Sequence, residues 1–412
     1  MKVGIVTEYY FPYLGGIAEH VHYTYKYFKK HDVDARIITP TMRGLRYRAE
    51  ASGAWAPEGD IIRIGESHPF YINGGFVRFT SPFGLTRRLR KVFAREKFDL
   101  IHVHAPMVPV LPVAAVMSAD CPVVGTFHTV FRKSFVYSLL RPYFRKVLGR
   151  IDGCLSVSPF SARAIQKYFD AEFTVIPNGV DTDVYKPDNE PVMEFRKDNV
   201  KNILFFGRFD PHNGLPTLLE AFGRIKSARR DTRLIIVGDG PLADVYRKSV
   251  PASLASSVVF AGIQHALKPN FYATADVFCH PASLHNLSLV CLEAMATGIP
   301  IVASDIPSFR WLMQEDAVYF PPQDSGKLAE SILGVLGNDG MALSLGERAR
   351  RRALRYSWDS VTARIISYFQ HVLFSRLPAA AVEQEMPLAA RIERGLPLQG
   401  LGSIDQGISL QR

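Results

Sequence analysis

Cysteine is scarce in this sequence, with only four such residues among 412. Cys121, Cys154, Cys279 and Cys291 are widely spaced and form no Cys-x-x-Cys pair. This pattern excludes a dense disulfide framework and argues against a zinc site. We expect all four to be buried, reduced thiols, because free cysteine packs as a small hydrophobic residue.

Long hydrophobic runs and nucleic-acid-binding motifs are also missing. No stretch of about 18 apolar residues occurs, and the first ten residues are too short an apolar segment for a signal peptide, so we expect a cytoplasmic protein without a membrane-spanning helix. No helix-turn-helix, zinc finger or RNA-binding aromatic string accompanies the basic residues, so we expect no nucleic-acid partner. The 49 basic residues outnumber the 39 acidic ones, and the net charge of +10 favours an anionic partner such as a nucleotide or a phospholipid surface.

Strands and helices alternate through the first half of the chain. Apolar segments that fit buried strands lie at 2–7, 35–40, 98–106, 122–129, 151–158 and 173–180, and a helix is predicted from about Ala18 to Lys30. Such alternation predicts an α/β domain built on a parallel, doubly wound sheet.

The second half repeats this design, with strands predicted at 201–210, 232–240, 258–262, 275–282 and 299–304 and a helix at 216–228. A polar linker with two prolines, residues 181–200, separates the halves. We predict one domain over 1–185 and another over 200–355, with a ligand cleft between the carboxyl edges of their sheets. Residues 377–412 have no clear period, and we predict a flexible tail there.

The segment 281–304 carries the strongest single signal for a ligand site. Ser288 is placed to cap a helix, Gly298 to end it with a positive φ, and the apolar run 299–304 to form a buried strand. A helix N-terminus after a loop binds phosphate through free N–H groups and the positive end of the helix dipole. Glu293, one turn inside this helix, is placed to hold a ribose diol.

Several longer strings together resemble the retaining glycosyltransferases of the GT-B fold, in the branch of the phosphatidylinositol mannosyltransferases. The matching strings are PYLGGIAEHV, FDLIHVHAP, PVVGTFHT, RPYFRKVLGRIDG, VIPNGVD, FFGRFD and LEAMATGIPIVASDIPSFR, and the similarity runs from Met1 to about Leu373. The resemblance implies two Rossmann-like domains facing across a cleft, with a final helix, 356–376, that crosses back to the N-terminal domain. It also implies that a hexose, such as mannose from GDP-mannose, passes to a lipid-linked or phosphoinositide-like acceptor with retention of configuration.

The same resemblance assigns roles at the donor site. His128 would contact the sugar or phosphate, Arg208 the departing diphosphate and Glu293 the ribose, and these three are the candidate catalytic residues. The residues expected to line the donor site are Gly15, Gly16, Arg208, Asn213, His285, Asn286, Leu287, Ser288, Leu289 and Glu293. The glycine pair does not form the Gly-x-Gly-x-x-Gly fingerprint, which argues against a dehydrogenase. No tightly bound cofactor and no obligatory metal are implied, because in this family the donor's own phosphate assists the reaction.

Two departures from the family pattern leave alternatives open. Asn213 stands where the family has a lysine five residues after the arginine, so one of two charges on the leaving group is missing. His285 stands where the family has the first glutamate of a Glu-x7-Glu pattern, and a histidine cannot copy the acceptor pattern of a carboxylate. A catalytically impaired nucleotide-sugar binder or partner subunit is therefore the alternative function, and an epimerase on the same fold is a weaker one.

Three histidines lie within predicted strands. His128 could be an ordinary packed core histidine, but its place in a matching string favours a functional role. For His102 and His104, which lie on one strand, we expect side chains on opposite faces, structural roles and no shared metal.

A basic helix is predicted at 85–97. Its charged residues include Arg87, Arg88, Arg90, Lys91 and Arg95, opposite a stripe of leucine, valine and phenylalanine. The composition fits either a solvated face over a core or docking on an anionic membrane. In the resembling family the helix at this place contacts membranes, so we expect a peripheral protein on the inner face of the membrane.

Three residues match positions of the family's acceptor pocket. Tyr9 would stack on an inositol-like ring, and Lys133 and Arg78 would pair with the phosphate of the acceptor. Each could equally belong to ordinary packing or to the surface.

Overall fold

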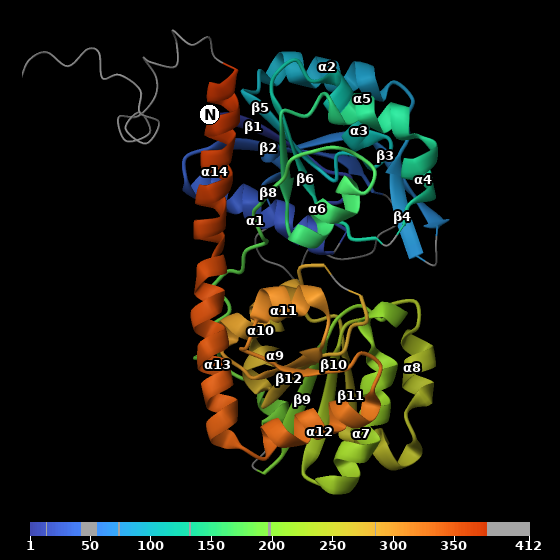
Figure 1. Cartoon of the computed structure of the whole chain (residues 1–412), viewed down its shortest axis with the longest axis vertical. Helices are drawn as coiled ribbons and strands as arrows, with labels where there is room; N and C mark the ends of the chain where they lie inside the picture. Colours follow the sequence, from blue (N-terminus) through green and yellow to red (C-terminus); the bar gives the residue numbers. More distant parts are fainter. Residues whose placement is uncertain are drawn as a thin grey trace, which may run out of the picture.

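The computed structural model describes residues 1–13, 15–42, 56–72, 75–131, 133–196, 199–284 and 286–376. His285 and the tail predicted at 377–412 lie outside the described residues. The chain forms two α/β units stacked along the long axis of the molecule, each with its own sheet (Figure 1). This confirms the fold class predicted from the sequence.

The N-terminal sheet has the strand order β4-β3-β2-β1-β5-β6-β7-β8. Its strands are β1 (Lys2–Val6), β2 (Asp34–Thr41), β3 (Ile61–Ile72), β4 (Gly75–Thr80), β5 (Leu100–His104), β6 (Val123–Phe127), β7 (Gly153–Ser156) and β8 (Thr174–Val175). All pairs are parallel except β3 with β4. The β3–β4 hairpin was not predicted, because these strands at the sheet edge carry charges and a proline instead of a continuous apolar run.

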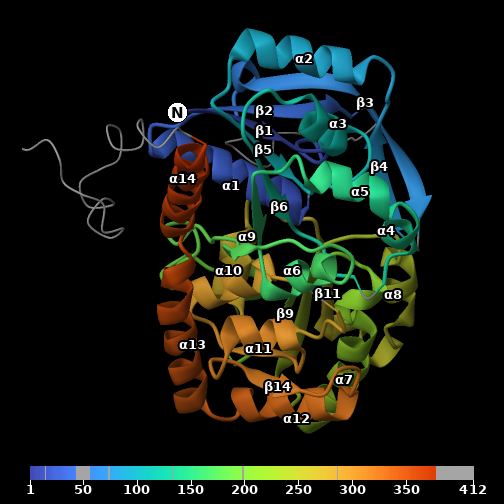
Figure 2. The same cartoon turned by 45° about the horizontal axis from the view of Figure 1, so that its top comes forward.

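Helices cover both faces of this sheet (Figure 2). They are α1 (Gly16–Lys30), α2 (Leu85–Glu96), α3 (Leu111–Ser118), α4 (Phe135–Leu139), α5 (Arg141–Leu148) and α6 (Pro159–Gln166). Apolar residues of α2, α3 and α5 share one core with the sheet, while α1 and the C-terminal helix α14 (Trp358–Ser375) share another.

The C-terminal sheet is parallel throughout, in the order β11-β10-β9-β12-β13-β14. Its strands are β9 (Lys201–Phe206), β10 (Thr232–Val237), β11 (Val258–Gly262), β12 (Val277–His280), β13 (Ile301–Ser304) and β14 (Val318–Phe320). Its helices are α7 (Leu215–Ala228), α8 (Ala243–Ser249), α9 (Lys268–Thr274), α10 (Leu289–Thr297), α11 (Pro307–Met313), α12 (Ser325–Leu336) and α13 (Asp339–Ala353). Among the strands of this sheet, only the short edge strand β14 was not predicted.

Helix α10 has the ends that the sequence predicts. The Ser288 hydroxyl accepts a hydrogen bond from the Cys291 N–H, and Gly298 ends the helix with φ 72°. This left-handed conformation favours glycine because it has no Cβ. The positive end of α10 is therefore held at a defined place, at the junction of the two units.

Helix α14 leaves the C-terminal unit and packs on the N-terminal one, as Figure 1 shows at its left side. The buried Trp358 begins this helix, and its ring stacks on Tyr23 and meets the edge of His20, both from α1. A Cβ on Gly179 would lie 2.5 Å from Cδ2 of Trp358, so only glycine lets the segment after β8 pass this ring. The packing of α14 on the N-terminal unit thus depends on one aromatic side chain that contacts the backbone of a glycine.

All four cysteines are free, and three of them are buried. Cys121 is only half-buried, because it lies in the turn before β6. Among the described residues, none of the helices combines the length and the apolar composition that crossing a bilayer requires.

We predict that Trp358→Ala destabilises the protein by about 3–5 kcal/mol, because a large buried ring leaves a cavity between α1, α14 and the segment after β8. Urea unfolding measures this loss. The control Leu343→Ala removes a side chain that is 66% exposed and should change stability by no more than about 0.5 kcal/mol. Equal effects of the two changes would contradict the anchoring role of Trp358.

Candidate active site between the two units

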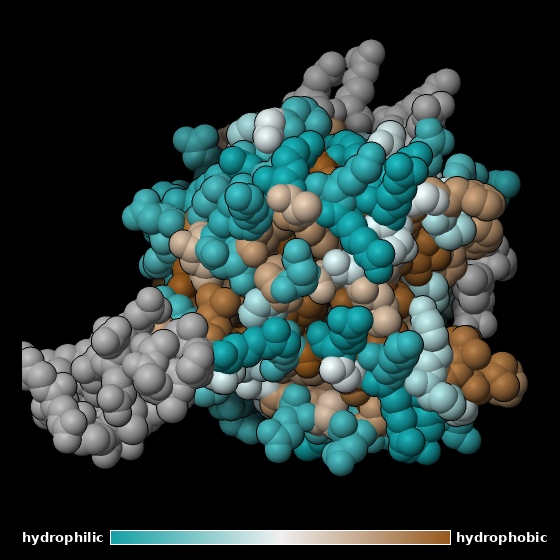
Figure 3. Space-filling model, turned by 90° about the horizontal axis from the view of Figure 1, so that it is seen from above, coloured by the Kyte–Doolittle hydropathy of each residue, from teal (hydrophilic) through white to brown (hydrophobic). Residues whose placement is uncertain are grey.

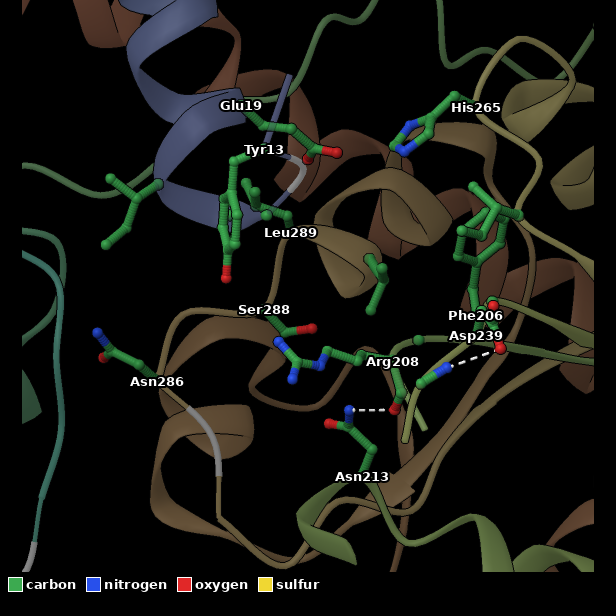
Figure 4. Close-up of a pocket in the computed structure, with 18 of the residues that line it drawn as sticks. Tyr13, Glu19, Phe206, Arg208, Asn213, Asp239, His265, Asn286, Ser288 and Leu289 are labelled. Carbon is green, nitrogen blue, oxygen red and sulfur yellow. Dashed lines mark hydrogen bonds between the residues drawn. The ribbon is translucent and has the colours of Figure 1, made fainter. Parts of the chain in front are cut away.

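A cavity of about 860 Å³ lies where the carboxyl ends of the two sheets face each other. The N-terminal unit contributes the loop after β1 and His128 after β6. The C-terminal unit contributes Arg208 after β9, the turn Gly238–Asp239–Gly240 after β10, and the segment before α10 (Figure 4). This is the place where open parallel sheets bind ligands.

Two helix N-termini open into this cavity. Gly15 and Gly16 start α1, and no side chain caps its first N–H groups. Ser288 and Leu289 start α10 and also line the cavity. Both dipoles therefore place partial positive charge and backbone donors where a diphosphate would lie.

Arg208 supplies a full positive charge at the same place. Figure 4 shows its side chain reaching into the cavity, and its Nε lies 3.0 Å from a carboxylate oxygen of Asp210. Asn213 also lines the cavity, where its amide donates a 2.7 Å hydrogen bond to the Arg208 carbonyl. Asn213 thus supports the loop that carries Arg208 and adds no charge of its own.

The turn after β10 brings backbone unusually close to the Arg208 loop. Gly238 has φ 136°, and a Cβ there would lie 1.9 Å from the Gly207 carbonyl oxygen. Only glycine fits this approach. The turn thereby sets Asp239 on the cavity wall.

Asn286 joins the two units across the cavity. Its amide nitrogen donates a 2.6 Å hydrogen bond to the His128 carbonyl, and its amide oxygen accepts one from the Ser158 hydroxyl. The sequence predicted a donor-site residue here but not a bridge. The bridge holds the loop before α10 against the N-terminal unit.

Glu293 lies in a buried polar cluster behind the cavity wall. Its carboxylate accepts hydrogen bonds of 2.6 Å from the Lys268 ammonium and 2.8 Å from the Tyr272 hydroxyl. Lys268 lines the cavity and also lies 3.7 Å from Glu19 on α1. In this arrangement Glu293 is not among the described residues that line the cavity, so its predicted contact with ribose stays a prediction of the resemblance.

The charges of this cluster follow from burial and pairing. Burial alone would lower the pKa of Lys268, but Glu19 and Glu293 together outweigh burial and raise the pKa. Burial raises the pKa of Glu293 by more than Lys268 lowers it. The net effect is an ammonium held firmly as a cation on the cavity wall.

His20, His102 and His104 pack together behind His128, and the placement of two of them corrects one expectation. The rings of His102 and His104 lie on the same face of β5, with centroids 4.3 Å apart, because residues two apart on a strand share a face. His104 Nδ1 lies 2.9 Å from His128 Nε2. His128 lines the cavity, as predicted.

The three residues predicted for the acceptor pocket do not all line the cavity. Arg78 is buried, lines the cavity and donates a 2.6 Å hydrogen bond to the Ser67 carbonyl. Tyr9 lies next to it, with its hydroxyl 3.4 Å from the Arg78 backbone nitrogen, but it is not part of the described lining. Lys133 is exposed and also lies outside that lining.

Glu8 was not predicted as a site residue, yet it is buried beside Arg78. Its carboxylate accepts hydrogen bonds from the Ser67 and Thr80 hydroxyls. Burial raises the pKa of Glu8 to about 7, although the two hydroxyls and Arg78 oppose this rise.

Further residues of the lining also escaped prediction. They are Tyr13, Glu19, Asn178, Asp239, Gln264, His265, Lys268 and His280. The Gly-Asp-Gly turn was a readable signal for Asp239, whereas Lys268 meets Glu293 only through the packing of α9 on α10.

The basic face of α2 is exposed, as its pattern predicted. Leu85, Leu89 and Phe93 are buried against the sheet, while Arg87, Arg88, Arg90, Lys91 and Arg95 face outward. Figure 3 looks onto the end of the molecule where α2 lies and shows hydrophilic side chains across its upper part, with hydrophobic ones toward the right. Arg95 is partly neutralised by Glu96, whose carboxylate lies 2.7 Å away.

Comparison with known proteins agrees with this architecture. Residues 14–184 match the family described as Glycosyltransferase Family 4, and residues 200–338 match Glycosyl transferases group 1. The chain is also similar to a glycosyltransferase of Rickettsia africae, with TM-score 0.71 and 18% identity over 90% of this chain and 98% of the other. A structure of HepE from Anabaena in complex with UDP gives TM-score 0.72 and 18% identity, covering 90% of this chain and all of that chain (100%).

The fold, the cavity between the units and these matches place the chain among the glycosyltransferases of the GT-B fold. Within that class it is similar to the phosphatidyl-myo-inositol mannosyltransferase of Mycolicibacterium smegmatis, at 29% identity over 90% of this chain and 94% of the relative. It is also 25% identical to the alpha-monoglucosyldiacylglycerol synthase of Streptococcus pneumoniae, over 81% of this chain and 78% of that protein.

We predict that Glu8 makes the stability of the protein fall as pH rises from about 4.5 to 7. In this window the folded protein holds a proton on Glu8 that the unfolded chain has lost. As pH rises through it, the free energy of unfolding therefore falls by up to about 3 kcal/mol relative to that of Glu8→Gln. Urea unfolding of the wild type and Glu8→Gln over this range measures the difference. A difference that does not change with pH would contradict the buried, proton-binding role of Glu8.

Proposed function

We propose that this glycosyltransferase moves a hexose from a nucleotide sugar to a lipid-linked acceptor at a membrane surface, with retention of configuration. The observation that carries the proposal is the convergence of Arg208 and two helix N-termini on one cavity between the units. GDP-mannose is the first donor to test, because relatives at 29% identity are named as mannosyltransferases.

In this proposal the protein accelerates the reaction by positioning the donor and stabilising its leaving group. Negative charge grows on the diphosphate as the bond to the sugar breaks, and fixed donors aimed at that charge stabilise the transition state. Arg208 and the N-terminal amides of α1 and α10 supply this stabilisation. Arg208 exchanges the Asp210 carboxylate for the diphosphate when the donor binds.

Asn213 shapes this arrangement without replacing the charge that the resembling family has there. Its hydrogen bond to the Arg208 carbonyl fixes the backbone that presents the guanidinium. Lys268, which also lines the cavity, adds a cation that Glu19 and Glu293 partly neutralise. We propose that these protein groups stabilise the leaving group without a resident metal ion.

The acceptor is proposed to enter beside Arg78. This buried guanidinium can pair with a phosphate of a phosphoinositide-like or polyprenyl-linked acceptor. The named relatives that act on lipids agree with an acceptor of this class.

Membrane contact is proposed to occur through the N-terminal unit. The basic side chains of α2 suit an anionic surface, because each Lys or Arg near the lipid contributes about 1 kcal/mol of attraction. Large apolar side chains are exposed on the same unit, with Phe83 84%, Phe135 78% and Leu139 64% exposed. Phe83 comes just before α2, and the other two lie on α4, so basic and apolar groups are combined as in interfacial helices.

We predict that Arg208→Ala lowers kcat/KM for GDP-mannose by about 100-fold, because one charge-assisted contact with the leaving group is lost. A suitable control is Arg247→Ala, which removes an arginine of similar exposure, 45% against 44%, that also pairs with an aspartate but lies outside the described lining. Transfer and hydrolysis are followed by mass spectrometry with a panel of nucleotide sugars.

Equal losses in the two arginine variants would argue against the assigned place of the diphosphate. The wild type is also assayed after dialysis against EDTA, with and without added Mg²⁺ or Mn²⁺. Activity that disappears on dialysis and returns with the metal would refute the proposed metal independence. Donor binding without transfer or hydrolysis, over all donors and acceptors tried, would refute the proposed function.

We predict that the triple change Arg88→Gln, Lys91→Gln and Arg95→Gln weakens binding to vesicles containing anionic lipid by up to about 3 kcal/mol, at about 1 kcal/mol for each base. Co-sedimentation with vesicles measures the effect. The matched control triple is Lys248→Gln, Arg351→Gln and Arg355→Gln, which removes exposed bases from the C-terminal part of the chain.

The apolar part of the surface is tested with Phe135→Ser and Leu139→Ser. These changes should weaken binding to neutral and to anionic vesicles alike, because they remove area that enters the lipid. Unchanged binding of both the basic and the apolar variants would exclude α2 and α4 as the membrane surface.

A further inference from the structure

The histidines below the cavity form a cluster of direct ring contacts, with centroids 4.3 to 5.2 Å apart. His20 Nδ1 lies 2.7 Å from Asn178 Oδ1, and His102 Nε2 lies 2.7 Å from Thr126 Oγ1. His104 Nδ1 lies 2.9 Å from Nε2 of His128, whose ring lines the cavity. The rings of His20 and His104 both contact His128, and His104 also forms a hydrogen bond with it.

These four rings are neutral near pH 7. Burial lowers the pKa of His20 to about 4 and that of His102 to about 3. Burial also lowers the pKa of His104 and of His128 well below the ordinary value, and the neighbouring histidines add to the effect. Each ring thus carries one N–H, and its position decides what the ring can donate or accept.

The contact between His104 and His128 can form in two ways. Either His104 Nδ1 donates to His128 Nε2, or His128 Nε2 donates to His104 Nδ1. In the second case the only proton left for His104 is on Nε2, which is buried and has no hydrogen-bond partner among the described residues. In the first case Nε2 carries only a lone pair. An unpaired buried N–H is the more costly of the two, so the first arrangement is favoured.

The same choice determines what His128 presents to the cavity. When His128 Nε2 accepts a hydrogen bond, its single proton must lie on Nδ1. Among the described residues no side chain or backbone group forms a hydrogen bond with this nitrogen, and it is not one of the enclosed polar atoms. Nδ1 is therefore left for a ligand.

We propose that His104 is a positioning residue that fixes the tautomer of His128, so that His128 presents an N–H donor to an oxygen of the bound sugar nucleotide. This inference rests on the proposed function for the identity of the ligand but not for the tautomer itself. It makes His128 a hydrogen-bond donor toward a sugar or phosphate oxygen and excludes it as a general base at Nδ1.

The tautomer is measured on the wild-type protein without any ligand. Long-range ¹H–¹⁵N correlation spectra of protein labelled at histidine distinguish a protonated ring nitrogen from a bare one, and His128→Asn assigns the signal. We expect a protonated Nδ1 and a bare Nε2 for His128 at pH 7.5. A bare Nδ1, or a doubly protonated ring, overturns the proposal.

Two variants then test whether His104 sets this pattern. His104→Asn keeps an N–H donor close to the position of Nδ1. The protonated Nδ1 and bare Nε2 of His128 should therefore persist, and kcat/KM should stay within about threefold of the wild-type value. His104→Asp offers only acceptor oxygens when ionised, so at a pH above the titration of His128 the proton should move to Nε2. At that pH, kcat/KM of His104→Asp should fall by about tenfold or more, because the ligand loses the N–H donor of His128 Nδ1.

Equal losses of activity in the two variants, with the His128 pattern unchanged, would assign His104 a merely structural role and overturn the proposal. The two arms also separate the present inference from the proposed function. If no nucleotide sugar is turned over by the wild type, the proposed function fails, while the spectra of wild type, His104→Asn and His104→Asp still decide the tautomer.

Discussion

The fit of Trp358 against the bare backbone of Gly179 is the contact on which the rest of the architecture depends. It seats α14 on α1 at the point where the chain has just left the C-terminal unit. A helix anchored at its first residue fixes how the carboxyl ends of the two sheets face each other. The cavity, the bridge through Asn286 and the pair between Glu19 and Lys268 all require that alignment, since each uses residues from both units.

Charge in the cavity is arranged so that protein anions occupy the cations until a ligand arrives. Arg208 lies against Asp210, and Lys268 lies between Glu19 and Glu293. The N-terminus of α1 adds N–H donors that no side chain caps. In the proposed function, an incoming diphosphate would replace carboxylates as well as water. This exchange would limit the gain from any single contact and favour ligands that satisfy several groups together.

The buried strands and the ends of α10 could be predicted because each depends on local pattern. The place of the cavity could be predicted because open parallel sheets bind ligands at their carboxyl edges. Apolar runs such as residues 299–304 indicate strands covered on both faces, and Ser288 and Gly298 act on their own helix. Edge strands β3 and β4 lack such a run. The two faces of β5 were assigned wrongly for His102 and His104, although their spacing was sufficient to place them together. The pairing of Lys268 with Glu293 could not be predicted, because it is created by the packing of α9 on α10.

The bridge through Asn286 has a consequence for ligand binding. Its two hydrogen bonds tie the loop before α10 to His128 and Ser158 of the other unit. Any separation of the units would break both bonds together and free one wall of the cavity. A ligand that contacts both units would therefore be thermodynamically linked to this separation, and by reciprocity each would shift the other by the same factor.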